Sequence, residues 1–173
     1  MRIFLIGYMG SGKSSIGPLL AQRLGFPFIE TDRIVEEALG ANIPEIFQRS
    51  GERTFREAEF MALQTTIMLP EAVISLGGGT PCSTASQEYL HEAGISVYLR
   101  TSAEILATRL EKTADQRPLL AKAKEQGLLS FIRQHLEVRE MWYSQAELIV
   151  DTDLMAPEAI VERIAGDPLI KKC

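Results

Sequence analysis

The chain of 173 residues has few cysteines, no excess of positive charge and no long hydrophobic run. Its two cysteines, Cys82 and Cys173, lack metal-ligand spacing and require no disulfide, which fits a reducing compartment. The formal net charge of −5 argues against a general nucleic-acid partner but leaves room for a local cationic pocket. No apolar stretch approaches the roughly 20 residues that span a bilayer. We therefore expect a soluble cytoplasmic protein without a membrane or nucleic-acid partner.

The start of the chain is not typical of a removable targeting segment. Residues 2–6 form a short apolar run that leads directly into a glycine-rich motif, which cleavage of a signal peptide would destroy. The length favours one domain, and the sequence has no repeat, low-complexity stretch or linker. The prediction is a single domain over residues 1–173. Since no large exposed apolar stripe indicates an obligate dimer, we expect a monomer.

Residues 7–15 match G-x-x-x-x-G-K-[ST], the phosphate-binding loop of P-loop nucleotide enzymes. The glycines allow a tight turn that brings backbone N–H groups close to a polyphosphate. In this pattern the Lys13 ammonium reaches the β- and γ-phosphates, and the Ser14 hydroxyl ligates Mg²⁺. A helix that begins near Lys13 directs the positive end of its dipole at the same anion. The predicted ATP-binding residues of this loop are Gly10, Ser11, Gly12, Lys13, Ser14 and Ser15.

Short apolar runs alternate with helical patterns along the rest of the chain. The predicted strands cover residues 2–6, 26–29, 72–76, 95–99 and 147–150. Helices are predicted from residue 13 and over residues 33–39, 43–47, 51–69, 83–92, 103–110, 128–141 and 157–164. Such strands favour a parallel sheet with helices on both faces. The predicted fold is therefore a three-layer α/β/α arrangement of the P-loop kinase type, with a five-stranded parallel sheet.

Asp32 follows the second predicted strand and has two interpretations. Thr31 or Asp32 can cap the helix that comes next. Alternatively, Asp32 is a carboxylate at the C-terminal edge of a parallel sheet, where α/β proteins place their ligands. The sequence pattern leaves both interpretations open.

Two further groups suit an anionic substrate. Arg56 and Glu59 are i,i+3 neighbours on a helix, either as an exposed ion pair or as a guanidinium held rigid to bind an anion. Residues 77–79 are three consecutive glycines at a strand end, which form either a flexible turn or a loop that a ligand approaches closely.

Residues 111–121 are polar and interrupt the alternation of strands and helices. We expect them to form a mobile lid over the nucleotide. Arg117 within them is either a solvated surface side chain or a group that stabilises charge on the transferring phosphoryl group.

These stretches resemble the shikimate kinases, and the resemblance covers essentially the whole chain. It rests on the P-loop with Ile16-Gly17, on Thr31-Asp32, on Ile43-x-x-Ile-Phe-x-x-x-Gly-Glu-x-x-Phe-Arg-x-x-Glu59, on Gly77-Gly78-Gly79, on Arg117-Pro-Leu-Leu120 and on Arg139-x-x-x-Tyr143. Many unrelated proteins share the P-loop. The Gly-Glu-x-x-Phe-Arg-x-x-Glu segment together with the three glycines is much more specific.

The resemblance implies transfer of the γ-phosphoryl group of ATP, with Mg²⁺, to the 3-hydroxyl of shikimate in aromatic amino acid biosynthesis. It implies that residues 33–60 form a helical substrate-binding segment. It also implies that Arg56 and Arg139 bind the shikimate carboxylate, that Asp32 holds ring hydroxyls, and that Arg117 reaches the phosphates. The candidate catalytic residues are Lys13, Asp32 and Arg117. The candidate substrate-binding residues are Asp32, Arg56, Glu59, Gly77, Gly78, Gly79 and Arg139, and the candidate metal ligand is Ser14.

The sequence departs from the family pattern at one position near the metal. Many members carry Asp-x-Asp where this chain has Glu30-Thr31-Asp32. The first carboxylate of that pattern is thought to contact the hydration shell of Mg²⁺, and Glu30 keeps the charge on a longer side chain. The loop near residues 153–157, on the adenine side, matches loosely, and no contact is assigned to it.

Three alternatives stand beside this hypothesis. The first is another small hydroxy-acid kinase, such as a gluconate kinase, which a direct comparison of the two substrates would separate. The second is a GTPase-like switch, but the only asparagine, Asn42, is not followed by the lysine of a guanine-reading motif. The third is a nucleotide-binding interaction module without kinase activity, although every residue of the proposed phosphate site is present.

Overall fold

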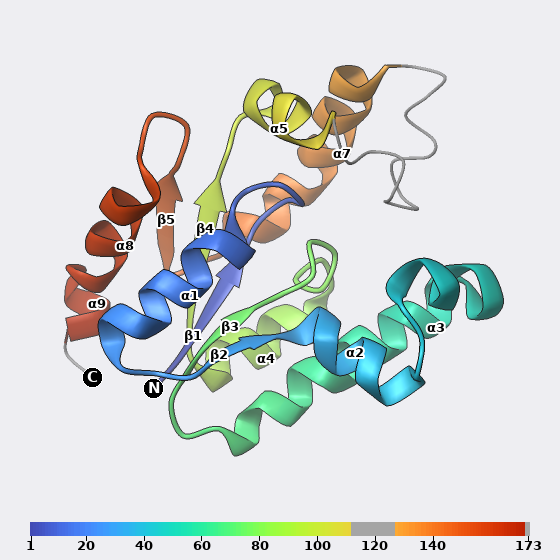
Figure 1. Cartoon of the computed structure of the whole chain (residues 1–173), viewed down its shortest axis with the longest axis horizontal. Coiled ribbons are helices and arrows are strands. Elements are labelled where there is room, and N and C mark those ends of the chain that lie inside the picture. The colour runs from blue at the N-terminus through green and yellow to red at the C-terminus, as the bar shows by residue number, and fades with distance from the viewer. Residues whose placement is uncertain (112–126, 172–173) are drawn as a thin grey trace.

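The computed structural model describes residues 1–111 and 127–171 of the chain (Figure 1). The predicted lid, apart from its first residue, lies outside the described residues, as do Arg117 and Cys173. Within those ranges, no helix is both long and apolar enough to cross a membrane.

Five parallel strands form a single sheet in the order β2-β3-β1-β4-β5. Their bounds are β1 Arg2–Ile6, β2 Phe28–Glu30, β3 Ala72–Ser75, β4 Ile95–Arg100 and β5 Leu148–Asp151. The central strand β1 aligns Leu5 with Ser75 on one side and with Val97 on the other. The carboxyl ends of the strands therefore meet at one edge of the sheet. The predicted five-stranded parallel sheet is confirmed.

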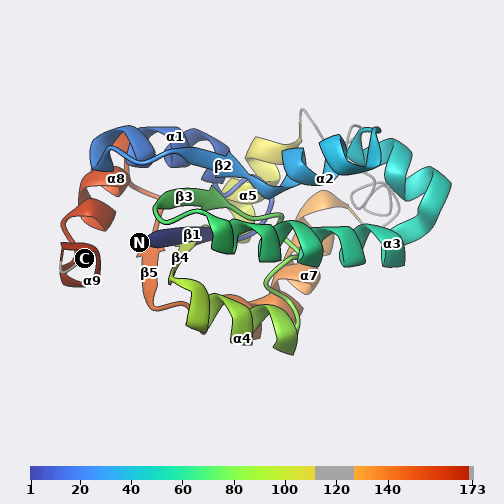
Figure 2. The ribbon, with the colours of Figure 1, turned by 90° about the horizontal axis from the view of Figure 1, so that it is seen from below.

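Helices cover both faces of this sheet. Their bounds are α1 Lys13–Leu24, α2 Thr31–Leu39, α3 Ile43–Thr65, α4 Thr84–Ala93, α5 Ala103–Leu110, α7 Leu128–Tyr143, α8 Pro157–Ala165 and α9 Pro168–Lys171. Figure 2 shows α1 and α8 on one side of the sheet and α4 on the other. The short helix α9 has no counterpart among the predicted elements.

The alternation of side chains along β1 divides the core in two. Ile3 and Leu5 face the side of α1 and α8, whereas Phe4 and Ile6 face the side of α4 and α7. All four side chains are fully or almost fully buried, as a central parallel strand requires. These two cores hold the P-loop and the ends of the neighbouring strands in fixed relative positions.

The segment between β2 and β3 has a small core of its own. Val35 of α2 packs with Ile46, Phe55 and Ala62 of α3. The backbone of α3 is helical throughout except at Gly51, whose φ of 77° and ψ of 171° separate two helical parts. The prediction of two helices in this region is thus confirmed, and the second ends at Thr65 before a 3₁₀ turn over Thr66–Met68.

Of the two interpretations of this position, the one in which Thr31 or Asp32 caps α2 is wrong. The helix already begins at Thr31, and Glu30 occupies the N-cap position without a side-chain cap. Thr31 is buried, and its hydroxyl donates to the Ser75 carbonyl (3.3 Å) and accepts from the Gly77 N–H (3.4 Å). The hydroxyl is therefore used to join α2 to the end of β3, which leaves Asp32 in the first turn of the helix.

Candidate active site

A cavity of about 560 Å³ lies at the carboxyl ends of the strands. Its walls come from the P-loop, the β2–α2 junction, α3, the glycine loop after β3, α7 and the segment after β5. This is the edge at which open α/β sheets bind ligands. The cavity brings together the candidate residues of the P-loop from Gly10 to Ser15 with Asp32, Arg56, Glu59, Gly77, Gly78, Gly79 and Arg139.

The P-loop is shaped by its backbone. Gly10 and Gly12 have φ values of 84° and 101°, in the left-handed region that side chains disfavour. Lys13, the first residue of α1, is 8% exposed, and its ammonium donates to the carbonyls of Gly7 (2.8 Å) and Tyr8 (3.0 Å). The loop thus folds around the lysine at the positive end of the α1 dipole.

The hydroxyls of this loop suit a phosphate group and its metal. Ser11 Oγ is buried and has no hydrogen-bond partner among the residues that the structure describes, so it can accept a ligand as its partner. Ser14 is exposed in the first turn of α1 and lines the cavity together with Glu30 and Asp32. Hard oxygen donors of this kind fit Mg²⁺. Within the described ranges, no group of three or more His, Cys, Asp or Glu residues could hold a metal by itself.

Arg56 and Glu59 form an ion pair whose carboxylate is buried and whose guanidinium is half-buried, so the pair is not a fully exposed one. Glu59 is 2% exposed, and its Oε2 lies 2.5 Å from Arg56 Nη1. Its other oxygen, Oε1, accepts a hydrogen bond from the Thr80 hydroxyl (2.8 Å), and Glu52 contacts the far side of Arg56 (3.1 Å). Burial raises the pKa of Glu59, and Arg56 opposes that shift. The guanidinium is therefore held at two points, as the rigid interpretation of this pair predicts.

The three glycines leave room for these side chains. A methyl group at Gly79 would overlap the Arg56 guanidinium, and one at Gly77 would overlap the Glu59 carboxylate. None of the three glycines has a left-handed φ. A flexible turn is thus unnecessary to explain Gly77 and Gly79, because absence of a side chain is what their positions require. The predicted close approach of a ligand stays a prediction.

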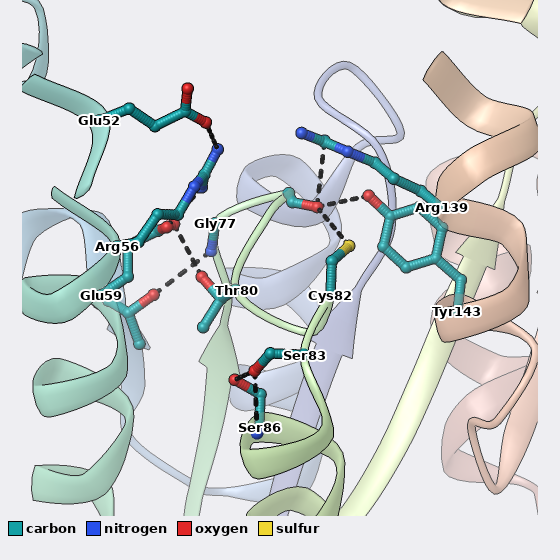
Figure 3. Close-up of polar contacts among 12 residues, drawn as sticks. Glu52, Arg56, Glu59, Gly77, Thr80, Cys82, Ser83, Ser86, Arg139 and Tyr143 are labelled. Atoms are coloured by element: carbon teal, nitrogen blue, oxygen red, sulfur yellow. Dashed lines mark hydrogen bonds and ion pairs between the residues drawn. The ribbon is translucent and has the colours of Figure 1, made fainter. Parts of the chain in front are cut away.

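Arg139 enters the cavity from α7, on the other side of the glycine loop (Figure 3). It is 6% exposed, and its Nη1 donates to the Gly78 carbonyl (3.2 Å). Its guanidinium also lies over the ring of Tyr8, 5.4 Å from the centroid, in a cation–π arrangement. Burial raises the pKa of Tyr8 to about 12, so this ring stays neutral beside the arginine.

Sequence reasoning missed several residues of the cavity. Arg109 donates to the Gly10 carbonyl (3.0 Å) and lines the cavity, as do Met155, Pro157 and Ile160. No motif identifies these four positions, although the adenine-side loop was expected nearby. Thr80, which contacts Glu59 of this cavity, has no local signal either, because its partner lies 21 positions earlier in the chain.

The known proteins that this chain resembles in sequence are shikimate kinases. The family model for shikimate kinase matches residues 9–167. A shikimate kinase from Bacteroides fragilis is 40% identical over 162 residues, which cover 94% of this chain and 90% of the relative.

Solved structures agree with this result. A shikimate kinase from Bacteroides thetaiotaomicron has a TM-score of 0.87 at 36% identity, covering 96% of this chain and 97% of that one. A shikimate kinase from Acinetobacter baumannii in complex with shikimate has a TM-score of 0.86 at 32% identity, covering 94% and 89%. The three-layer fold of the P-loop kinase type is thereby confirmed. The chain belongs to the shikimate kinase family and is a phosphotransferase.

Proposed function

We propose that this chain transfers the γ-phosphoryl group of ATP to the 3-hydroxyl of shikimate, giving shikimate 3-phosphate in aromatic amino acid biosynthesis. The observation that carries the proposal is one cavity lined both by a P-loop and by two arginines, the half-buried Arg56 and the buried Arg139. A phosphate donor and a small carboxylate acceptor are the ligands that such a cavity suits. Membership of the shikimate kinase family favours shikimate over gluconate as the acceptor.

At the donor end, the backbone N–H groups and hydroxyls from Gly10 to Ser15 bind the phosphates. The Lys13 ammonium exchanges its carbonyl contacts for the phosphate oxygens, where it offsets the negative charge of the transferring group. Ser14 would hold Mg²⁺, which would supply charge neutralisation, and Glu30 would lie near the metal with its negative charge. Mg²⁺ commonly keeps several waters and takes few protein ligands, which agrees with this sparse set of donors.

The adenine group belongs at the end of the cavity beyond the phosphates. Met155, Pro157 and Ile160 line the cavity with apolar side chains, and Arg109 offers a planar cation. A flat aromatic base packs well between an apolar surface and a guanidinium plane. We assign these four residues to nucleotide binding.

At the acceptor end, Arg56 and Arg139 bind the shikimate carboxylate from two sides. Arginine forms directional paired hydrogen bonds with carboxylates, so two guanidiniums fix the orientation of the ring. Glu59 holds Arg56, and Gly77, Gly78 and Gly79 border the ring. Asp32, at the β2–α2 junction between the two ends, accepts hydrogen bonds from the ring hydroxyls and receives the proton of the attacking hydroxyl.

The remaining assignments concern the chain as a whole. We assign residues 111–121 to a lid whose closure excludes water, and Arg117 to the phosphates of the bound nucleotide. Residues 33–60 form the substrate-binding helices of one domain spanning residues 1–173. We further propose that the protein acts as a cytoplasmic monomer.

The reaction can be tested directly. ADP release by the purified protein is measured with Mg-ATP alone, with shikimate and with gluconate, and mass spectrometry identifies the product. We expect release that depends on shikimate and a product heavier by one phosphoryl group. Release that depends on gluconate instead would transfer the assignment to the alternative kinase. Bound ATP without release in either case would favour a nucleotide-binding module.

A further inference from the structure

The loop from Gly77 to Cys82 carries an attachment point for each of the two arginines (Figure 3). Arg56, on α3, reaches the loop through Glu59 and the hydroxyl of Thr80. Arg139, on α7, reaches it directly at the Gly78 carbonyl. The two arginines are thus joined to one short piece of backbone although they stand 83 positions apart in the sequence.

Thr80 is well placed to hold Glu59 in one orientation. It is 5% exposed, and its own N–H donates to the Gly77 carbonyl (3.1 Å), which fixes it within the turn. The two oxygens of Glu59 are divided between Thr80 and Arg56. Without the hydroxyl, a buried carboxylate oxygen loses its donor, and the carboxylate gains freedom to rotate away from Arg56.

Tyr143 has the corresponding place on the other side of the loop. Its hydroxyl donates to the Gly78 carbonyl, the same oxygen that accepts from Arg139 and lies 3.8 Å from the Cys82 sulfur. The side chain is fully buried, and its ring packs against Tyr98 with centroids 5.0 Å apart. Since Tyr143 follows Arg139 by one helical turn, it fixes the loop relative to the arginine's own helix.

We propose that Thr80 and Tyr143 are positioning residues that set the separation of the Arg56 and Arg139 guanidiniums. The proposal rests on the proposed function, in which both guanidiniums bind one carboxylate. A carboxylate that is bound from two sides tolerates little change in the distance between its partners. Both residues therefore act on the affinity for shikimate without contacting it.

The test compares the KM for shikimate with the KM for ATP and with kcat. Thr80→Val keeps the shape of the side chain without the hydroxyl, and we expect it to raise the KM for shikimate about tenfold. For Tyr143→Phe we expect about a fivefold rise. The KM for ATP stays within about twofold in both, whereas a merely structural loss would alter both KM values together. Thr80→Ser, which keeps the hydroxyl, should restore the KM for shikimate.

Matched controls come from buried hydroxyls nearby. Ser86 hydrogen-bonds Ser83 next to the same loop, and Tyr98 donates to Glu140 on α7, but neither contacts an arginine of the pair in the described structure. Ser86→Ala and Tyr98→Phe should leave the KM for shikimate within about twofold. If Thr80→Val fails to fold, Thr80→Ala and Thr80→Ser differ only in the hydroxyl and give the same comparison.

A double-mutant cycle separates this inference from the proposed function. In an Arg56→Ala background, Thr80→Val should add no further loss, because its effect passes through Arg56. An unchanged KM for shikimate in Arg56→Ala alone would overturn the assignment of Arg56. Two outcomes would overturn the positioning role of Thr80 while the assignment of Arg56 stands. In the first, Arg56→Ala raises the KM for shikimate strongly but Thr80→Val does not. In the second, both substitutions raise it and their effects add in the double variant.

Discussion

The two ends of the cavity are built in different ways. At the phosphate end, the proposed ligands come from consecutive residues, Gly10 to Ser15, and the conformation of the backbone shapes the loop. At the acceptor end, side chains of α2, α3 and α7 meet the glycine loop through hydrogen bonds to its backbone and side chains. The first is a local structure that a short motif encodes, whereas the second depends on the assembled fold.

This difference predicts which kinetic constant a substitution changes and whether its effect reaches neighbouring residues. At the phosphate end, loss of one group should affect turnover, because in the proposed function the P-loop contacts charge that develops during transfer. At the acceptor end, loss of one group should weaken binding of one substrate, and the loss should pass to its hydrogen-bond partners. Four experiments test this contrast, from the largest expected effect to the smallest.

Lys13→Ala should lower kcat by about 10³-fold, since a positioned cation at the transferring phosphoryl group is lost. Steady-state kinetics at saturating ATP and shikimate measure it. Circular dichroism serves as the control for folding, because Lys13 also bonds the Gly7 and Tyr8 carbonyls. A normal kcat would contradict the role of Lys13 and remove the main distinction between the two ends.

Asp32→Asn should lower kcat by about 10²-fold while thermal stability is kept. The amide can still hydrogen-bond a ring hydroxyl but cannot accept its proton. Since Asp32 is not the N-cap of α2, loss of the charge removes no helix cap. Near-normal turnover, measured by ADP release, would show that the carboxylate only orients the substrate.

Arg139→Ala should raise the KM for shikimate by about 10²-fold and change the KM for ATP little. The expected size follows from a buried carboxylate that loses one partner of a charge pair. Arg133→Ala is a matched control on the same helix, where an exposed arginine pairs with Glu104 instead. Equal rises in both KM values would place Arg139 outside the arginine pair.

The contrast between the ends also explains what the sequence could predict. Apolar runs and the P-loop motif are local signals, so the sheet, most helices and the phosphate end were predictable to within a few residues. The Thr31 hydroxyl joins Ser75 and Gly77 instead of capping α2. The neighbouring sequence could not predict these hydrogen bonds, because both partners lie more than 40 positions away. The same holds for the contacts of Thr80 and Tyr143 with their distant partners. The use of Gly77 and Gly79 as space for Glu59 and Arg56 likewise depends on tertiary packing.

The pH dependence of the KM for shikimate should be the smallest of these effects, a change of several-fold. Burial raises the pKa of Glu59, and nearby Asp32 acts in the same direction, whereas Arg56 and Thr80 oppose the shift. A raised pKa means that Glu59 takes up its proton at a higher pH than an exposed glutamate does. As the pH falls through that range, the charge that holds Arg56 is lost, and the KM for shikimate rises while the KM for ATP does not.

Glu59→Gln makes this prediction specific. The amide can still contact Thr80 and Arg56 but carries no charge, so the variant should keep the raised KM for shikimate that the wild type reaches at low pH, without the step that Glu59 causes. The KM for shikimate of the variant and of the wild type is measured across pH with the same buffers and saturating ATP. We expect the ratio of variant to wild-type KM to fall towards one as the pH decreases. Parallel profiles would assign the step to another group, such as Asp32 or the substrate carboxylate. In that case the Glu59–Arg56 pair would keep its geometry without the charge of Glu59. Binding of shikimate would then depend less on this ion pair, and the contrast between the two ends of the cavity would be weaker than their contacts imply.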